Sequence, residues 1–292
     1  MKKRLICFLL GTMLQIVAQA QTHSVFVGIP PQSHIVKAIA GDTVEVQVLL
    51  KPGSSPATYN PSISQLNSMA QADAYFLMGL PFEEKIIGKI QSMLPNLPIV
   101  DTRSGIPMRH FGESEHHEHD SEEEAHHEHE VTDPHCWMSP DNLQLMAQTI
   151  LRTLEETAPE NADLFKRNYL IYCQKLEQTK VELQELMQTR QGLNVAVYHP
   201  AYGYLFDYCG IRQLVVEQMG KEPTAKALIH FAESIRSQGI QVMLLQQQFS
   251  ARSASILSQQ TGIRLITVNP LAEDAEDNFI EIIKALPETN PK

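Results

Sequence analysis

Residues 159–192 read PENADLFKRNYLIYCQKLEQTKVELQELMQTRQG and separate two halves of similar pattern. Between Glu160 and Gln191 there is no proline or glycine. Apolar residues recur there at spacings of three, four and seven, which predicts one face of a helix: Phe165, Tyr169, Tyr172, Leu176, Leu183 and Met187. Pro159 suits a first helical position and Gly192 a helix end. At 1.5 Å per residue such a helix would be about 45 Å long, enough to run along two lobes.

On each side of this helix, short β-branched and aliphatic runs alternate four times with helical stretches. The expected strands are 24–29, 43–50, 74–78, 98–100, 194–198, 213–216, 242–245 and 264–268. This alternation predicts parallel sheets covered by helices on both faces. We therefore expect an α/β protein with two (β/α)4 lobes joined by one long linker helix. The expected domains are an N-terminal lobe over 21–158, the linker over 159–191 and a C-terminal lobe over 192–292.

The first twenty residues have the form of a cleavable signal peptide. A positive Lys2-Lys3-Arg4 precedes an apolar run, residues 5–17, and Ala18-Gln19-Ala20 matches an A-x-A cleavage site. No later apolar stretch approaches the roughly 20 residues that a membrane helix needs. We expect cleavage after Ala20 and a soluble protein in the periplasm.

The chain is acidic, with a formal net charge of −11 that becomes more negative when the signal peptide is removed. This charge argues against nucleic acid and anionic membrane surfaces as partners, and it favours a cation. After cleavage Cys136, Cys173 and Cys209 remain, without a CxxC spacing. A disulfide framework is not indicated, and we expect buried, unpaired thiols.

Residues 110–130 form an acidic, histidine-rich loop with seven of the chain's 12 histidines. Two His-His-Glu-His repeats lie ten residues apart and contain His116, His117, His119, His126, His127 and His129. Neutral imidazole suits zinc, copper, nickel and iron, and the acidic residues raise the local concentration of cations. The alternative is a solvated acidic loop with incidental histidines, but the clustering favours metal collection.

Several polar residues directly follow predicted strands, where ligands gather in open parallel sheets. His199 follows the strand 194–198, Asn269 follows 264–268, and the loop 51–59 follows 43–50. His135 closes the histidine-rich loop. The ends of these strands would bring such residues together.

Five motifs give the chain a family resemblance. They are PGSSPATYNP (52–61), DPHCWMSP (133–140), YHPAYGY (198–204), GKEPT (220–224) and VNPLA (268–272). In this order they resemble the metal-binding subunits of bacterial zinc and manganese ABC importers, the cluster A-I solute-binding proteins. The resemblance covers essentially all of the chain after residue 20. It implies two (β/α)4 lobes, one long helix, and a metal held between the lobes by three histidines and often a carboxylate.

Two of the implied ligands match and two depart. His135 and His199 fall on family histidines, whereas Ala57 stands where the family has a histidine and Asn269 where it has an acid. A closed zinc site needs four good donors, so the departures lower the expected affinity. Three ways of completing the site remain open: a histidine of the 110–130 loop, His34 from the helix after the first strand, or water with Asn269.

The resemblance implies an extracytoplasmic, monomeric protein that captures zinc and delivers it to an ABC permease. Manganese is the less favoured ion, because the imidazoles suit zinc and Asn269 removes an oxygen anion. A metal buffer without a transporter is one alternative. A zinc enzyme is another, but no HExxH occurs and the sequence places no glutamate beside either histidine as a general base. We therefore expect no catalysis.

Overall fold

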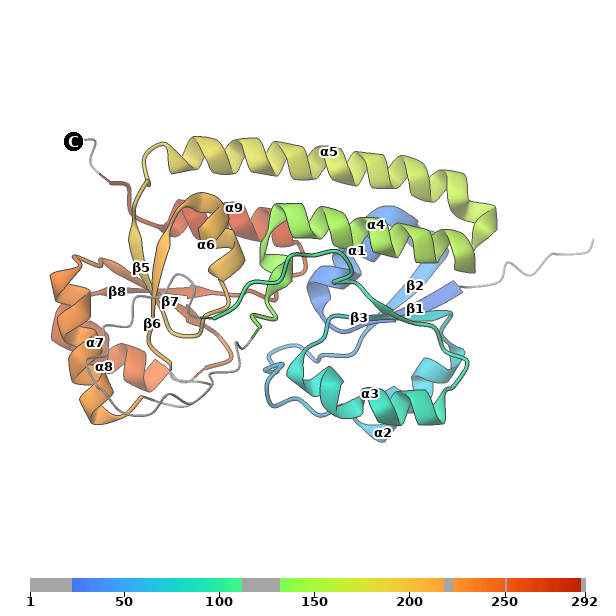
Figure 1. Cartoon of the computed structure of the whole chain (residues 1–292), viewed down its shortest axis with the longest axis horizontal. Coiled ribbons are helices and arrows are strands. Elements are labelled where there is room, and N and C mark those ends of the chain that lie inside the picture. Colours follow the sequence, from blue (N-terminus) through green and yellow to red (C-terminus); the bar gives the residue numbers. More distant parts are fainter. Residues whose placement is uncertain (1–22, 112–131, 218–222, 250, 290–292) are drawn as a thin grey trace, which may run out of the picture.

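A computed structural model describes residues 23–111, 132–217, 223–249 and 251–289. The predicted signal peptide and the six histidines of the two loop repeats lie outside these residues. Within them, Figure 1 shows two α/β lobes side by side with one long helix running along both. The predicted fold class is confirmed.

The N-terminal lobe is built around a four-stranded parallel sheet in the order β2-β1-β3-β4. Its strands are β1 (His23–Val27), β2 (Val44–Val48), β3 (Ala74–Leu77) and β4 (Ile99–Asp101). Its helices are α1 (Pro30–Ala40), α2 (Ile63–Ser68), α3 (Pro81–Met93) and α4 (Pro140–Thr157). A short 3-10 turn, η3 (Cys136–Met138), directly precedes α4.

The C-terminal lobe repeats this order, with a parallel sheet β6-β5-β7-β8. Its strands are β5 (Asn194–Val197), β6 (Arg212–Val215), β7 (Val242–Gln246) and β8 (Arg264–Val268). Its helices are α6 (Gly203–Cys209), α7 (Ala225–Ser237), α8 (Ala251–Thr261) and α9 (Ala275–Ala285). All eight predicted strands are therefore present, with small shifts at their ends.

The linker helix α5 spans Ala162–Met187, so the predicted limits of 159 and 191 were too wide. Pro159 begins a separate 3-10 turn, η4 (Pro159–Asn161), because Ala158 leaves α4 with non-helical angles. The other end finishes before Gly192, which adopts φ 67°. At 1.5 Å per residue the helix is still about 40 Å long.

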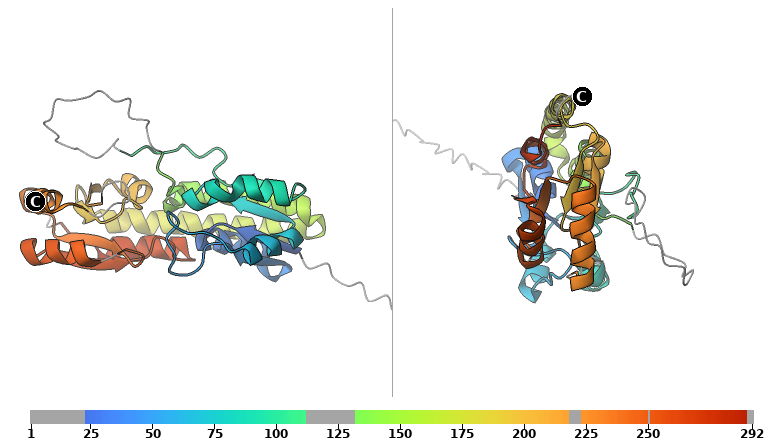
Figure 2. Two further views of the ribbon diagram at one scale, coloured as in Figure 1. Left: turned by 90° about the horizontal axis from the view of Figure 1, so that it is seen from below. Right: turned by 90° about the vertical axis from the view of Figure 1, so that its left-hand side faces the viewer.

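Helix α5 contacts α1 and α4 of the first lobe and α6 and α9 of the second. Its predicted apolar face is buried, as the positions of Phe165, Tyr172, Leu176, Leu183 and Met187 confirm. In the end-on view the helix lies at one edge of the molecule (Figure 2). One continuous hydrophobic core includes residues of both lobes and of α5. We infer that the lobes move little relative to each other, because separating them would disrupt this packing.

Cys136, Cys173 and Cys209 are unpaired in the described structure. Cys136 and Cys209 are buried, as expected, and burial raises the pKa of each to about 12, whereas Cys173 is only partly buried. None of the helices described is both long and apolar enough to cross a membrane.

Candidate metal centre

The two histidines that match the family lie close together between the lobes, with their rings in an edge-on arrangement. His135 comes from the loop between β4 and α4, and His199 comes two residues after β5. Their Nε2 atoms are 3.3 Å apart, and the ring planes are inclined by 78°. His135 is buried and the side chain of His199 is 22% exposed, so the pair remains open to solvent on one side. Residues 64 positions apart in sequence are thus brought together at one point.

A carboxylate holds each imidazole from behind. His135 Nδ1 lies 2.7 Å from Asp133 Oδ1, and His199 Nδ1 lies 2.9 Å from Glu217 Oε1. An ionised carboxylate only accepts hydrogen bonds, so each Nδ1 carries the proton and each Nε2 is left with its lone pair. Two lone pairs that face each other at hydrogen-bond distance repel, unless a cation or a proton lies between them.

The distance between the two Nε2 atoms fits a tetrahedral zinc ion. Zinc binds imidazole nitrogen at about 2.0–2.1 Å, and a tetrahedral angle of about 109° then separates two such nitrogens by about 3.3–3.4 Å. The 3.3 Å found here requires almost no rearrangement. The structure therefore presents half of a tetrahedral site, with the remaining positions to be filled by other donors.

A network anchored by Arg109 fixes Asp133 and ties it to the other lobe. Arg109 Nη1 donates to Asp133 Oδ2 at 3.3 Å, and its Nε donates to Asp207 Oδ2 of α6 at 2.8 Å. Gly203, in the YHPAYGY motif, permits this approach, since a Cβ there would lie 2.6 Å from Arg109 Nη1. The motif therefore supports the metal centre through packing as well as through His199.

The surroundings of His199 favour its neutral form. Burial lowers the pKa of His199 and the neighbouring His135 acts in the same direction, although the hydrogen bond to Glu217 opposes both. Phe249 stacks on the ring at 4.9 Å, and Gln246 donates to the backbone oxygen of His199 at 2.9 Å. Neutral imidazole is the form that binds metal.

Trp137, Tyr202 and Tyr204, which follow the two histidines in sequence, are buried packing residues. Trp137 donates from Nε1 to the backbone oxygen of Pro270 at 2.8 Å, joining the two lobes beside the site. Tyr204 donates to the backbone oxygen of Asp133 at 3.0 Å. These contacts confirm that the aromatic residues of the motifs shape the site from behind.

Asn269 has its side-chain oxygen engaged elsewhere. Its Oδ1 accepts hydrogen bonds from Leu271 N at 3.1 Å and from Gln248 Nε2 at 3.3 Å. An amide oxygen has two lone pairs, so a metal bond would require one of these hydrogen bonds to break. Ala57 lies exposed on its loop and supplies no donor from its side chain.

His34 is not placed with the cleft histidines. Its Nε2 lies 3.5 Å from Glu276 Oε2 and 3.7 Å from Asp274 Oδ2, both at the start of α9. The expectation that His34 substitutes for the missing ligand is therefore not supported. Although His34 follows β1 in sequence, α1 turns its side chain towards α9 and α5 instead.

The six loop histidines lie in residues that the structure does not describe, but both ends of that segment are fixed. His110 and Thr132 form an isolated antiparallel bridge, and Asp133 N donates to Arg109 O at 2.8 Å. The chain therefore leaves the described fold after residue 111 and returns at Thr132, three residues before His135.

Sequence reasoning missed the two carboxylates that orient the ligands. Asp133 enters the sequence analysis only as part of a motif, and Glu217 does not enter it. Glu217 does lie beside His199, but it contacts Nδ1, on the side of the ring opposite to the ion position. It orients a ligand and is not placed as a general base.

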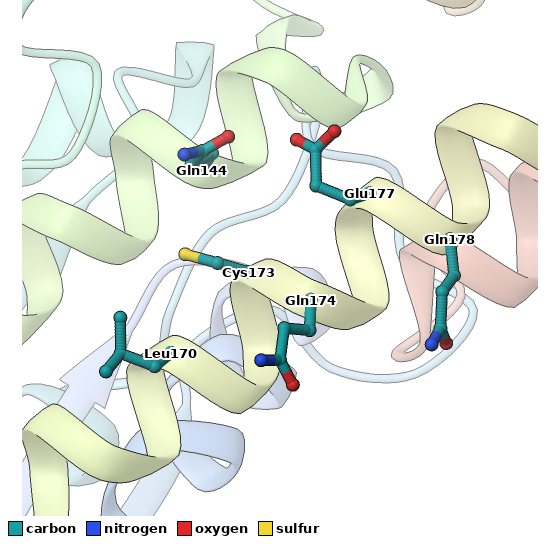
Figure 3. Close-up of a pocket in the computed structure, with 6 residues that line it drawn as sticks. All are labelled: Gln144, Leu170, Cys173, Gln174, Glu177 and Gln178. Carbon is teal, nitrogen blue, oxygen red and sulfur yellow. The ribbon is translucent and has the colours of Figure 1, made fainter.

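An open pocket on the outer surface lies between α4 and α5 (Figure 3). It is lined by Gln144, Leu170, Cys173, Gln174, Glu177 and Gln178. One carboxylate and one thiol, without imidazole, make a poor set of zinc donors. The pocket does not compete with the histidine pair as a metal centre.

Comparison with known proteins identifies the family of the chain. The family model described as "Zinc-uptake complex component A periplasmic" matches residues 25–289. The zinc-binding lipoprotein AdcA of Streptococcus pneumoniae is 27% identical over 273 residues, covering 89% of this chain and 54% of AdcA. The chain thus spans about half the length of that relative. A putative metal-binding protein of Chlamydia trachomatis is 26% identical over 89% of both chains.

Solved structures show the same architecture. A crystal structure of ZnuA superimposes with a TM-score of 0.81 at 28% identity, covering 90% of this chain and 97% of ZnuA. A zinc-bound ZnuA deletion mutant gives 0.82 at 27% identity, covering 93% and 100% of the two chains. A structure of FpvC with Mn2+, 21% identical with a TM-score of 0.75, shares the fold. The fold, the paired histidines and the family match together show that this chain belongs to the periplasmic zinc-uptake complex component A family.

Proposed function

We propose that the protein captures zinc outside the cytoplasm and delivers it to the permease of an ABC importer. The observation that carries this proposal is the 3.3 Å separation of the two Nε2 atoms, each imidazole being held from behind by a carboxylate. This arrangement suits a divalent cation, because both Nε2 lone pairs point to one position and the two carboxylates lie on the opposite sides of the rings. The names of the zinc-binding relatives support the choice of ion.

Zinc would join the two lobes, because His135 belongs to the first and His199 to the second. Capture then requires only that the lobes stay in their present positions. Release requires the two Nε2 atoms to separate, after which neither lobe alone holds enough ligands for tight binding. A displacement of about 1 Å would already exceed the tolerance of a zinc–nitrogen bond. The shared core of the lobes fits a small movement of this kind.

For the third ligand we favour a histidine of the 110–130 loop, with water in the fourth position. Both ends of the undescribed segment are anchored beside His135, and the repeats supply six imidazoles. Water with Asn269 is the competing arrangement, which costs Asn269 one of its two hydrogen bonds. The loop would therefore collect ions and also complete the site.

We further propose that residues 1–20 are a cleaved signal peptide and that the mature protein is a periplasmic monomer. The basic residues, apolar run and A-x-A site support export. Manganese is the less favoured ion, since two imidazoles without a carboxylate ligand suit zinc better.

Zinc titration of the mature protein against a chromophoric chelator tests the capture step. His135→Ala and His199→Ala should each remove the tightest equivalent, while the exposed His230→Ala on α7 should retain it. If the protein that carries both His135→Ala and His199→Ala still bound one equivalent of zinc tightly, the assignment of the metal centre would be refuted.

Delivery is tested by uptake of radioactive zinc into cells that carry either the native or the double-variant gene. Loss of uptake in the variant supports an importer. If uptake is unchanged while zinc binding is lost, the protein is a metal buffer instead.

A further inference from the structure

A second cluster of metal-binding side chains lies where α1, α9 and α5 meet. It contains His34 of α1 with Asp274 and Glu276 at the start of α9, and each residue offers one ligand atom within 4.8 Å of the others. Helices α1 and α9 both pack against α5, and Figure 1 shows α9 below it. The cluster is separate from the histidine pair and, like it, takes residues from both lobes.

Glu276 is the residue that calls for an explanation. Its side chain is fully buried, and within the described residues neither carboxylate oxygen meets the geometric criteria of a hydrogen bond, although Tyr172, His34 and Lys175 all act on it electrostatically. The Tyr172 hydroxyl is likewise buried, and it interacts with Glu276 without meeting those criteria. Burial is also the main cause that raises the pKa of Glu276. A buried carboxylate in this condition is costly unless a cation compensates it.

The positive charges already present do not fully meet this need. Lys175 Nζ lies 2.8 Å from Asp274 Oδ2, and it also has Asp277 Oδ1 within 3.7 Å. The lysine therefore forms its ion pairs with Asp274 and Asp277 and acts on Glu276 from a longer distance, while Glu276 faces His34 Nε2 at 3.5 Å. Within the described residues, the imidazole of His34 is the ion-pair partner of Glu276.

We propose that His34, Asp274 and Glu276 form a second binding site for a divalent transition-metal ion, which would tie the two lobes together. One imidazole and two carboxylates are a donor set that zinc and its neighbours accept. The ligand atoms around His34 lie at 3.5 and 3.7 Å, close to the spacing of about 3.2–3.6 Å that bonds of about 2.0–2.2 Å produce. His34 and Asp274 are partly exposed, so an ion can enter and both side chains can adjust.

An ion at this site would bind between His34 and the two carboxylates. An unprotonated His34 Nε2 would bind the ion, Lys175 would shift from Asp274 towards Asp277, and Glu276 would gain the charge that it lacks. Because the ligands come from α1 and α9, an ion here would stabilise the present arrangement of the lobes. This inference does not depend on the cleft: the two sites share no residue.

The test is a long-range proton–nitrogen NMR spectrum of the mature full-length protein with nitrogen-labelled histidines, titrated with zinc. The His34 signals are assigned by their loss in His34→Lys, which places a positive charge opposite the carboxylates but cannot bind metal while protonated. We expect the Nε2 resonance of His34 to shift after the cleft has filled. Glu276→Gln should raise the zinc concentration needed by at least about tenfold, whereas His230→Ala should leave it unchanged.

If the His34 resonance does not move when the cleft histidines are saturated, the cluster is an ion-pair contact between the lobes and the proposal is wrong. Should Glu276→Gln fail to fold, Asp274→Asn provides the same comparison at a partly exposed position. The signals of His135 and His199 report the cleft separately, so failure of the proposed function and failure of this inference are distinguishable.

Discussion

Glu217→Ala should weaken zinc binding although it removes no ligand of the ion. Glu217 Oε1 accepts the Nδ1 proton of His199 at 2.9 Å and is itself buried. Without it, the ring loses both the contact that sets its orientation and the negative charge that makes Nε2 a stronger donor. Loss of such a supporting carboxylate costs about 10- to 100-fold in metal affinity, or about 1.4–2.7 kcal/mol.

Glu217→Gln separates these two effects. The amide oxygen can still accept the proton of His199 Nδ1, so the ring keeps its orientation, but the negative charge is lost. We therefore expect a loss of affinity of about tenfold or less, smaller than that for Glu217→Ala. The difference in zinc affinity between the two variants measures how much of the loss comes from the orientation of the His199 ring.

Both variants are measured by competition with a chromophoric zinc chelator. Glu233→Ala, which removes an exposed carboxylate from α7, is the control for the change in net charge. Circular dichroism checks that each variant is folded. If a folded Glu217→Ala protein binds zinc as tightly as the native protein, the carboxylate does not support the ligand and our account of the site is wrong.

Three further perturbations test the surroundings of the site. Zinc affinity should fall as the pH drops below about 6.5, because protonated imidazole does not bind metal. Since the pKa of His199 is lowered, protonation of His199 itself should weaken binding only below that pH. A flat zinc affinity from pH 7.5 to 5.5 in a calorimetric titration would argue against imidazole ligands. In Gly203→Ala the new Cβ would lie 2.6 Å from Arg109 Nη1. We expect this contact to lower the free energy of unfolding by about 1–3 kcal/mol, measured by thermal unfolding, and to weaken zinc binding. If neither the stability nor the zinc affinity changes, Arg109 moves freely. Deleting residues 111–130 should weaken the tightest zinc equivalent and remove weaker ones, and adding Ala57→His should restore much of the loss; an unaffected tight equivalent would favour water with Asn269.

The fold was predictable because its signals are local. The apolar spacing within α5 and the alternation of strands and helices lie in short windows of sequence, and both were confirmed. The ends of α5 were not predictable, since the backbone angles at Ala158 decide that Pro159 starts a separate turn. A residue that suits a helix start does not fix where the helix starts.

The metal centre was only partly predictable for a related reason. His135 and His199 follow from their motifs, but Glu217 reaches His199 through the pairing of β5 with β6, in which Val197 lies opposite Val215. In the same register, the backbone N–H of Glu217 donates a hydrogen bond to the backbone oxygen of Tyr198 at 2.9 Å. The sequence does not state this register, so the neighbour of His199 could not be read from it.

His34 shows the opposite error. Its place after the first strand suggested the cleft, because strand ends converge there. A helix turns by about 100° at each residue, however, so a position within the first turns of α1 can face either the cleft or the neighbouring helices. Its contacts with Glu276 and Asp274 of α9 settle the direction. Only the three-dimensional packing carries that information.

The most direct test of the metal centre is diffraction from zinc-loaded crystals of the mature protein at energies on either side of the zinc absorption edge. We expect an anomalous peak about 2.0–2.1 Å from both His135 Nε2 and His199 Nε2, with Asp133 and Glu217 still hydrogen-bonded to the Nδ1 atoms. The central claim is contradicted if the strongest peak lies away from this pair, or if it contacts only one of the two histidines.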